Sequence, residues 1–437
     1  MVLKAEVLSP NSLNACNGEI MPTSKDKGNP APPPLINDCI MKSAVQRPSR
    51  IFRVVVSRSV NLVLPVAVFW MFSAGVTGSA RAQTFSVLYN FVNGADGASP
   101  DRGSLVLDGA GNFYGTTYAG GLSSQGTVFK LDSTGKETVL YNFRGLRDGA
   151  GPIGGVILDG AGNLYGTTSY KGTFNAGTVF KVSPAGKFKI LHTFTGGADG
   201  GQPYAGLIRD HRGNLYGTTK TGGASGYGTI FKLDSTGKET VLYSFTGSPD
   251  GGQPAARLIR DTAGNFYGTT SHEGLFHYGT VFELDTTGKE TDLHDFTGSG
   301  DGIFPLGALV RDTTGNLYGT TSEGGPFNLG MVFELDPSGR ETDLLNFGGS
   351  DGSYPVGDLI RDAAGNIYGT TAYGGDFGDG TVFTLDAFAS FKLLHSFSGA
   401  DGYQPYAGLV QDRAGDLYGT TRYGGAYGNG VVYKIIP

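Results

Sequence analysis

Short runs of apolar and β-forming residues recur along most of the chain, and Gly, Asp, Ser or Pro bounds each run. In one representative stretch four such runs follow one another, at residues 206–210, 214–219, 229–234 and 239–245. Runs of this length with this punctuation are typical of β-strands. We name them a, b, c and d in chain order.

The connections between these strands predict an antiparallel sheet. Asp210 begins the a–b connection and Gly213 ends it, and Asp234 and Gly237 do the same between c and d. Asp at a turn start and Gly where φ is positive are typical of tight turns. The b–c and d–a connections are longer. Strands c and d carry apolar residues on both faces, so the sheet needs packing partners on both sides.

This four-strand unit occurs seven times. The string Tyr-Gly-Thr-Thr marks it, with its tyrosine at positions 114, 165, 216, 267, 318, 368 and 418. A lone d strand, 85–91, precedes the first a strand, and a c strand, 430–437, ends the chain. Pairing the two ends would complete a seventh sheet. We therefore predict an all-β fold, a seven-bladed β-propeller of four-stranded antiparallel blades closed by strand 85–91 on the C-terminal blade. A linear β-solenoid is disfavoured, because the one-strand offset has no use there.

The repeated residues resemble known families. The order D-x-x-G-N-L-Y-G-T-T followed by G-T-V-F-K-L-D resembles the Gloeobacter/Verrucomicrobia (GloVer) tandem repeat of bacterial exported proteins, and D-x-x-G-N-L-Y with a later G-K is similar to NHL-type propeller repeats. The resemblance covers residues 85–437. It implies a repeat scaffold and no particular reaction.

The first 82 residues differ from the rest and predict export. Residues 41–82 have the layout of a signal peptide: arginines, an apolar run at 60–76, and Ala80-Arg81-Ala82, after which we expect cleavage. An uncleaved membrane anchor is the alternative. Residues 1–40 show no periodicity and are expected to be a disordered leader or to precede a true start at Met41. Residues 83–437 are expected to form one domain, secreted, periplasmic or on the cell surface, with no membrane contact after cleavage.

Charge and cysteine content narrow the function. Residues 83–437 hold 24 basic and 35 acidic residues, a net charge of −11, which argues against nucleic-acid binding. Both cysteines, Cys16 and Cys39, precede this region, so it has no disulfide and no thiol nucleophile. Glycine accounts for 74 residues of the chain, as a fold with many turns requires.

No motif predicts a metal or a cofactor. His272-Glu273 with His277 has i, i+5 spacing and lies beside Gly274, whereas the zinc motif needs two histidines at i, i+4 on a helix. Each d–a connection carries one Asp-Gly, which suits a turn better than a Ca²⁺ site. These aspartates are Asp96, Asp148, Asp199, Asp250, Asp301, Asp351 and Asp401. We also interpret Tyr-Gly-Thr-Thr as a packing motif instead of a ring of ligand-binding hydroxyls.

The b–c connections are the most variable and are rich in aromatic residues. In a four-stranded meander they emerge on the same face as the d–a connections, where rigid scaffolds usually carry binding residues. These rings could stack on sugars or on a partner's apolar side chains, or could simply cover the blades. The candidates are Tyr118, Tyr170, Phe174, Tyr227, Phe276, Tyr278, Phe327, Tyr373, Phe377, Tyr423 and Tyr427.

Four consecutive units place an arginine before the Asp of the a–b turn. These arginines, Arg209, Arg260, Arg311 and Arg361, could form a sector that binds an anion, although we expect local pairing with the neighbouring Asp.

Taken together, the sequence predicts an exported, monomeric, non-catalytic scaffold that binds a polysaccharide or a protein outside the cell. The alternatives are a propeller enzyme, such as a glycan lyase or hydrolase with an active site in the channel, and a structural or adhesive surface protein.

Overall fold

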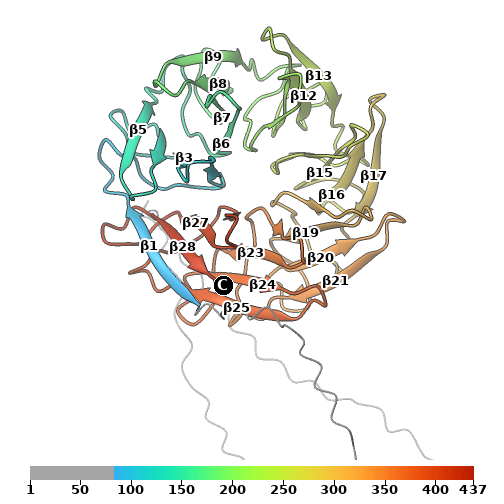
Figure 1. Ribbon diagram of the computed structural model, residues 1–437. Coiled ribbons are helices and arrows are strands. Elements are labelled where there is room, and N and C mark those ends of the chain that lie inside the picture. Colours follow the sequence, from blue (N-terminus) through green and yellow to red (C-terminus); the bar gives the residue numbers. More distant parts are fainter. Residues whose placement is uncertain (1–82) are drawn as a thin grey trace, which may run out of the picture. The chain divides into compact units, whose positions relative to one another are not determined.

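The computed structural model describes residues 83–437, which form seven four-stranded antiparallel sheets in a ring (Figure 1). The seven-bladed propeller is confirmed. The proposed leader (1–40) and signal peptide (41–82) lie outside the described residues. Within 83–437, no helix is long and apolar enough to cross a membrane.

Each blade runs from a short inner strand a to an outer strand d. The a strands are β2 (Val106–Leu107), β6 (Val156–Leu158), β10 (Ile208–Arg209), β14 (Ile259–Arg260), β18 (Val310–Arg311), β22 (Ile360–Arg361) and β26 (Val410–Gln411). The b strands are β3 (Phe113–Thr117), β7 (Leu164–Thr168), β11 (Leu215–Thr219), β15 (Phe266–Thr270), β19 (Leu317–Thr321), β23 (Ile367–Thr371) and β27 (Leu417–Thr421).

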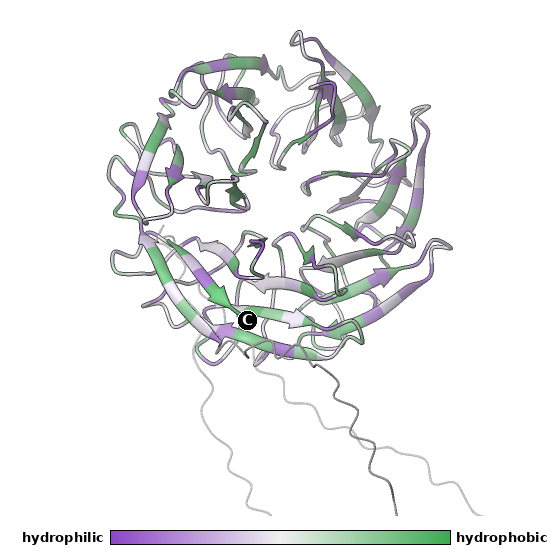
Figure 2. Cartoon of the chain, viewed as in Figure 1, coloured by the Kyte–Doolittle hydropathy of each residue, from purple (hydrophilic) through white to green (hydrophobic). Residues whose placement is uncertain are grey.

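The remaining strands form the outer half of each blade. The c strands are β4 (Thr127–Leu131), β8 (Thr178–Val182), β12 (Thr229–Leu233), β16 (Thr280–Leu284), β20 (Met331–Leu335), β24 (Thr381–Leu385) and β28 (Val431–Ile436). The d strands are β5 (Glu137–Asn142), β9 (Phe188–Thr193), β13 (Glu239–Ser244), β17 (Glu290–Asp295), β21 (Glu341–Asn346), β25 (Phe391–Ser396) and β1 (Thr84–Asn90). Polar and apolar bands alternate along several outer strands (Figure 2).

The seventh blade is built from both ends of the described chain, as predicted. β1 pairs antiparallel with β28, from Thr84 opposite Ile436 to Asn90 opposite Val431 (Figure 1). The sheet order β1-β28-β27-β26 therefore repeats the a-to-d order of the other blades. This pairing closes the ring without a covalent link.

Neighbouring blades contact one another through buried aromatic rings. The Phe that follows each d strand packs edge to face on an aromatic ring of the next c strand, as between Phe245 and Phe282, whose centroids are 5.2 Å apart. The pairs at the closing blade, Phe397–Tyr433 and Phe91–Phe129, have the same 5.2 Å separation. Each such pair contributes about 0.5–1.5 kcal/mol beyond the burial of its area.

The Tyr-Gly-Thr-Thr motif holds each blade together. The Tyr216 hydroxyl donates to Asp210 in the a–b turn at 3.0 Å, and the same bond recurs in all seven blades. Gly217 faces Phe231, whose ring would lie only 2.9 Å from an added Cβ. Thr219 shares a 2.8 Å hydrogen bond with Thr229. The two threonines of the motif, Thr218 and Thr219, are both buried, so the motif faces the interior and forms no ring of exposed hydroxyls.

Each d strand contains a β-bulge, which explains its apolar residues on both faces. The register between β12 and β13 shifts so that Ile230 and Phe231 lie opposite Tyr243 and Val241, which leaves Leu242 without a partner. A bulge turns one residue away from strict alternation. Leu242 accordingly packs in the core between its own blade and the next.

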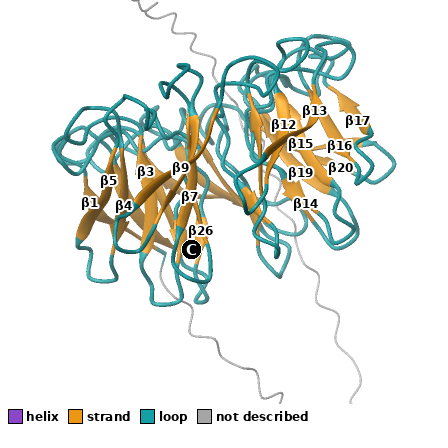
Figure 3. Ribbon diagram, turned by 90° about the horizontal axis from the view of Figure 1, so that it is seen from above, coloured by secondary structure: helices purple, strands orange, loops and turns teal. Residues whose placement is uncertain are grey.

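The two faces of the ring differ in their connections. On one face the a–b and c–d connections are tight turns, such as the one in which the Gly237 N–H donates to the Asp234 carbonyl at 2.9 Å. The longer b–c and d–a connections emerge on the other, which we call the loop face (Figure 3).

Candidate binding site at the mouth of the central channel

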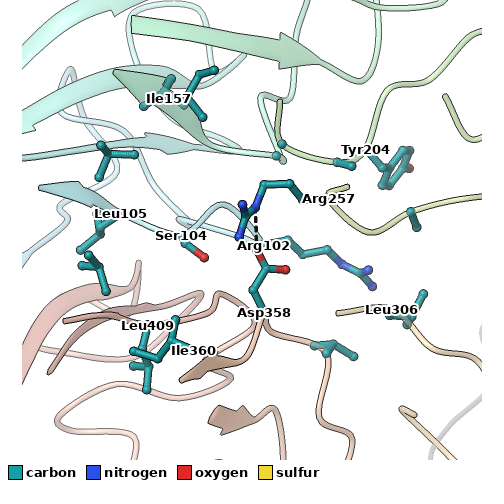
Figure 4. A pocket seen from close by; sticks show the side chains of 18 residues that line it. Arg102, Ser104, Leu105, Ile157, Tyr204, Arg257, Leu306, Asp358, Ile360 and Leu409 are labelled. Atoms are coloured by element: carbon teal, nitrogen blue, oxygen red, sulfur yellow. Dashed lines mark hydrogen bonds and ion pairs between the residues drawn. The ribbon is translucent and has the colours of Figure 1, made fainter. Parts of the chain in front are cut away.

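The a strands surround a cavity of about 230 Å³ on the axis of the ring. Its walls are largely apolar, with Leu105, Ile157, Ile360 and Leu409 from four different blades (Figure 4). Pockets that bind small molecules usually measure about 300–1,000 Å³. The cavity therefore has room for one small group or for the end of a longer ligand.

One repeat position contributes four residues to the lining of this cavity and breaks the sevenfold pattern. Four residues before the a–b turn Asp, the blades carry Ser104, Gly155, Gly206, Arg257, Ala308, Asp358 and Gly408. The two charged members form an ion pair, with Arg257 Nε 3.2 Å from Asp358 Oδ2 (Figure 4). The Ala308 N–H donates to the other Asp358 oxygen at 2.9 Å. The Ser104 hydroxyl is buried without a hydrogen-bond partner in the described chain.

Backbone hydrogen bonds between neighbouring blades position the residues above the cavity. The Gln202 N–H donates to the Ala176 carbonyl of the preceding blade at 2.8 Å, and the Gln202 carbonyl accepts from the Lys220 N–H at 3.1 Å. The Gln404 carbonyl likewise accepts a hydrogen bond from the Arg422 N–H at 3.0 Å. Gln202 and Gln404 adopt φ values of 53° and 57°. Left-handed backbone at residues other than glycine costs energy that the surrounding structure must offset.

Aromatic side chains gather where the channel opens on the loop face. The Tyr373 hydroxyl bonds to that of Tyr406 at 3.0 Å, and the Tyr373 ring lies 5.8 Å from that of Tyr354. Tyr170 and Tyr204 are joined through their hydroxyls. The structure thus joins residues of b–c loops to residues of d–a loops.

Cations lie among these rings. Lys220 Nζ is 5.2 Å from the centre of the Tyr204 ring, and the Arg422 guanidinium is 5.0 Å from the Tyr423 ring. Arg422 also lies 3.6 Å from Asp101, a buried carboxylate. We call this group of residues the channel mouth: Arg102, Tyr118, Tyr170, Tyr204, Lys220, Tyr354, Tyr373, Tyr406, Arg422 and Tyr423.

The eleven predicted aromatic residues separate into three groups. Tyr118, Tyr170, Tyr373 and Tyr423 belong to the channel mouth. Tyr227 and Tyr278 pack against cores between blades. The other five lie at exposed tips of the b–c loops and do not converge on one cavity: Phe174, Phe276, Phe327, Phe377 and Tyr427.

The four predicted arginines lie near the tight-turn face, away from the channel mouth. Within residues 83–437 none of them forms a salt bridge with the adjacent Asp, which corrects the local pairing expected from the sequence. Each guanidinium instead lies over a tyrosine ring of the preceding blade, at 5.3–5.8 Å. A delocalised guanidinium stacks well on an aromatic face. A sector that binds an anion stays a prediction.

The repeated Asp-Gly aspartates bond to their own loops. Asp96 accepts hydrogen bonds from the N–H groups of Val92 and Gly94 and from the Tyr89 hydroxyl, at 2.9–3.1 Å. The two histidines of the His272–His277 segment have other partners: His272 stacks on Phe304, with centroids 4.9 Å apart, and the exposed His277 bonds to Glu273 at 3.0 Å.

Sequence reasoning missed the cations and the d–a tyrosines of the mouth. The signal lay in the alignment of the seven units: the residue after Tyr-Gly-Thr-Thr is Lys220 or Arg422 in two blades but Ser or Ala in four. Arg102 occupies an insertion, because its blade has one residue more between Pro100 and Asp108 than the other blades have.

Comparison with solved structures shows the same fold in a distant extracellular domain. The extracellular domain of a hybrid two-component system from B. thetaiotaomicron matches with a TM-score of 0.54 and 14% identity, over 80% of this chain. The chain spans only 39% of that structure's length. A gluconolactonase from Xanthomonas campestris matches with a TM-score of 0.40 and 14% identity, over 63% of this chain and 82% of its own.

Family comparison identifies the repeat itself. No curated protein sequence matches the chain significantly. The family model described as the Gloeobacter/Verrucomicrobia repeat matches residues 76–274, 187–363 and 257–437. These matches cover every blade, and the chain therefore belongs to the Gloeobacter/Verrucomicrobia repeat family.

Proposed function

We propose that this protein is an exported, non-catalytic propeller that binds a glycan at the channel mouth. The observation that carries the proposal is the group of tyrosine rings and cationic side chains on the face with the variable loops, of which Arg102 and Tyr204 also line the central cavity. Sugar rings present C–H faces that stack on aromatic rings, and sugar hydroxyls accept hydrogen bonds from Arg and Lys. The signal-like leader and the extracellular neighbour of the same fold support export.

The exposed rings at the loop tips extend this surface. Phe174, Phe327 and Phe377 are 57–65% exposed, which is unusual for phenylalanine. A polysaccharide longer than the cavity could contact these rings after its end enters the mouth. A protein partner would be expected to contact only the exposed rings at the loop tips.

Loss of rings from the mouth tests this proposal. The double variant Tyr373→Ala and Tyr423→Ala should bind immobilised glycans about tenfold more weakly, because each aromatic contact contributes about 0.5–1.5 kcal/mol. Phe388→Ala is the matched control, since Phe388 is 91% exposed in a c–d turn on the opposite face. Glycan binding that is equal in the double variant and the wild type would contradict the proposal.

An enzyme acting in the channel is the second candidate. The observation in its favour is the unrepeated group Ser104, Arg257 and Asp358, which lines the cavity. Incubation of the protein with each bound glycan, followed by chromatography of the products, separates the two. We expect the glycan to be recovered intact. Cleavage that is lost in Asp358→Asn would identify an enzyme instead.

A further inference from the structure

Four cations lie along the cavity and the channel mouth of a domain that is acidic overall: Arg102 and Arg257 line the cavity, and Lys220 and Arg422 lie among the tyrosine rings of the mouth. Two of them have carboxylate partners: Arg257 pairs with Asp358 at 3.2 Å, and Arg422 lies 3.6 Å from Asp101. The other two are Arg102 and Lys220. Residues 83–437 carry a net charge of −11, so a local surplus of positive charge opposes the general trend.

Arg102 and Lys220 have no carboxylate of their own in residues 83–437. Burial raises the pKa of Asp101 and the charges of Arg422 and Arg102 lower it, but that carboxylate already lies beside Arg422. Neither forms a salt bridge with any residue of the described part of the chain, and both side chains are half-buried. Arg102 lines the same cavity as Tyr204, and Lys220 Nζ lies 5.2 Å from the centre of the Tyr204 ring, so the two cations are near one another at the channel mouth. In agreement, burial and then the positive charge of Arg102 lower the pKa of Lys220. Like charges held together and partly out of water are unfavourable unless an anion joins them.

Both cations depart from the repeat. Arg102 lies in the one-residue insertion of the first blade, and Lys220 replaces the Ser or Ala that four other blades carry after Tyr-Gly-Thr-Thr. The packing of a blade therefore does not require either charge. Tyr204 lies beneath Lys220 at 5.2 Å and also lines the cavity, so an aromatic face is available beside the charged groups.

Resting on the glycan-binding function proposed above, we propose that the ligand is an acidic oligosaccharide whose anionic group lies between Arg102 and Lys220. Guanidinium and ammonium groups are the donors that bind carboxylate and sulfate oxygens best. The acidic surface elsewhere repels a long polyanion, while the mouth attracts one. The structure thus favours a short oligosaccharide, or the end of a chain, carrying a uronate carboxylate or a sulfate.

Titration calorimetry with matched probes tests the inference. The probes are a tetrasaccharide of galacturonic acid, a neutral tetrasaccharide of galactose and a sulfated galactose tetrasaccharide. We expect the uronate or the sulfated probe to bind at least tenfold more tightly than the neutral one, and to lose affinity as salt rises. Tighter binding of the uronate assigns the anion to a carboxylate, and tighter binding of the sulfated probe to a sulfate.

Charge variants locate the anion. Arg102→Gln and Lys220→Gln should each weaken binding of the acidic probe at least tenfold, while Lys220→Arg restores most of it. Lys189→Gln, on outer strand β9, is the control and should change nothing. Equal binding of acidic and neutral probes, unaffected by these variants, would overturn the inference and leave the proposed function intact. Binding of none of the probes, or of any glycan on an array, would overturn both.

Discussion

At Tyr433 the seventh blade places a hydroxyl where the other six blades carry phenylalanine. The ring is fully buried, and its Oη has no hydrogen-bond partner in the described chain. A buried hydroxyl without a partner costs about 1–3 kcal/mol. We expect Tyr433→Phe to raise the free energy of unfolding by about 1 kcal/mol, measured by urea denaturation.

The reverse change in a neighbouring blade is the matched control. Phe383 occupies the equivalent position in the sixth blade and is also fully buried. Phe383→Tyr should therefore lower the free energy of unfolding by about as much as Tyr433→Phe raises it. A less stable Tyr433→Phe variant would show that the hydroxyl has a partner in solution.

Individual site residues were only partly predictable. Aromatic residues of the b–c loops could be found from composition, but the ring brings seven equivalent positions to one axis, and a linear sequence does not show which positions point there. Arg257 and Asp358 are 101 residues apart and meet only because their blades face the same cavity. Arg102 and Tyr204, the ring that Lys220 lies over, line that cavity together for the same reason.

Among the elements, the glycine before each c strand combines a special backbone with a tight contact. Gly228 has a φ of +100°, and an added Cβ would lie 2.2 Å from the Thr219 carbonyl oxygen and 2.8 Å from Pro254 of the next blade. Gly226, two residues earlier, also has positive φ, at +86°, but nothing lies within 4 Å of its Cβ position. The two glycines therefore have similar backbone conformations, but only Gly228 has other atoms close to its Cβ position.

This difference gives a paired prediction. Gly226→Ala should lower the free energy of unfolding by about 1 kcal/mol, the usual cost of left-handed backbone. Gly228→Ala should lower it by at least 2 kcal/mol more, since backbone and proline atoms must move apart. Thermal denaturation followed by circular dichroism measures both. Equal losses would mean that the contact between blades relaxes freely.

The start of several d strands carries a glutamate that makes stability depend on pH. Burial and then the charge of Asp96 raise the pKa of Glu137 to about 7. Burial and then Asp343 raise the pKa of Glu341 to about 8. These groups bind protons more readily in the folded state, so their contribution is complete below about pH 4.5. It is lost as pH rises through 7 to 8.

We therefore expect the melting temperature to fall between pH 5 and pH 8. Below pH 4 the turn aspartates have the opposite effect, because the stability that their charged forms contribute is lost as the pH falls. Burial favours a higher pKa for Asp159, but hydrogen bonds led by those from Asn163 lower it to about 2. Glu137→Gln with Glu341→Gln should flatten the decline above pH 5. Asp376→Asn in an exposed loop is the control, and a decline that persists in the glutamine variant would assign it to other groups.

The elements themselves were largely predictable. Turn residues recurring at a fixed period marked the strands, and the predicted 229–234 and 239–245 correspond to β12 and β13 within one residue at each end. The inner strands are shorter than predicted: Ile208–Arg209 forms in place of 206–210, and only these two residues pair with β11. The bulge in each d strand showed in the sequence only as apolar residues on both faces, a pattern that packing on both sides of a regular strand also produces.

For the whole molecule, closure depends on one strand. Removal of residues 83–91 would expose the edge of β28 and remove Phe91 from its contact with Phe129. We expect this truncation to lower the melting temperature by more than 10 °C and to cause association, because an uncovered sheet edge pairs with other chains. Size-exclusion chromatography and calorimetry measure the two effects.

A truncation that spares β1 is the control. A variant with residues 1–40 removed keeps β1 and should melt as the full chain does. If the 83–91 truncation stayed monomeric and equally stable, the contribution of β1 to closure would be small.

The seventh blade, which is built from both ends of the chain, also determines when the ring can close during folding. β1 is synthesised before every other strand of the ring, yet its partner β28 follows it by more than 340 residues. Contacts between residues this distant in sequence form slowly. Until they form, the unpaired strand can associate with other chains. If the chain crosses a membrane from its N-terminus, β1 emerges first and β28 emerges last. A chaperone on the far side would therefore need to bind β1 until β28 arrives.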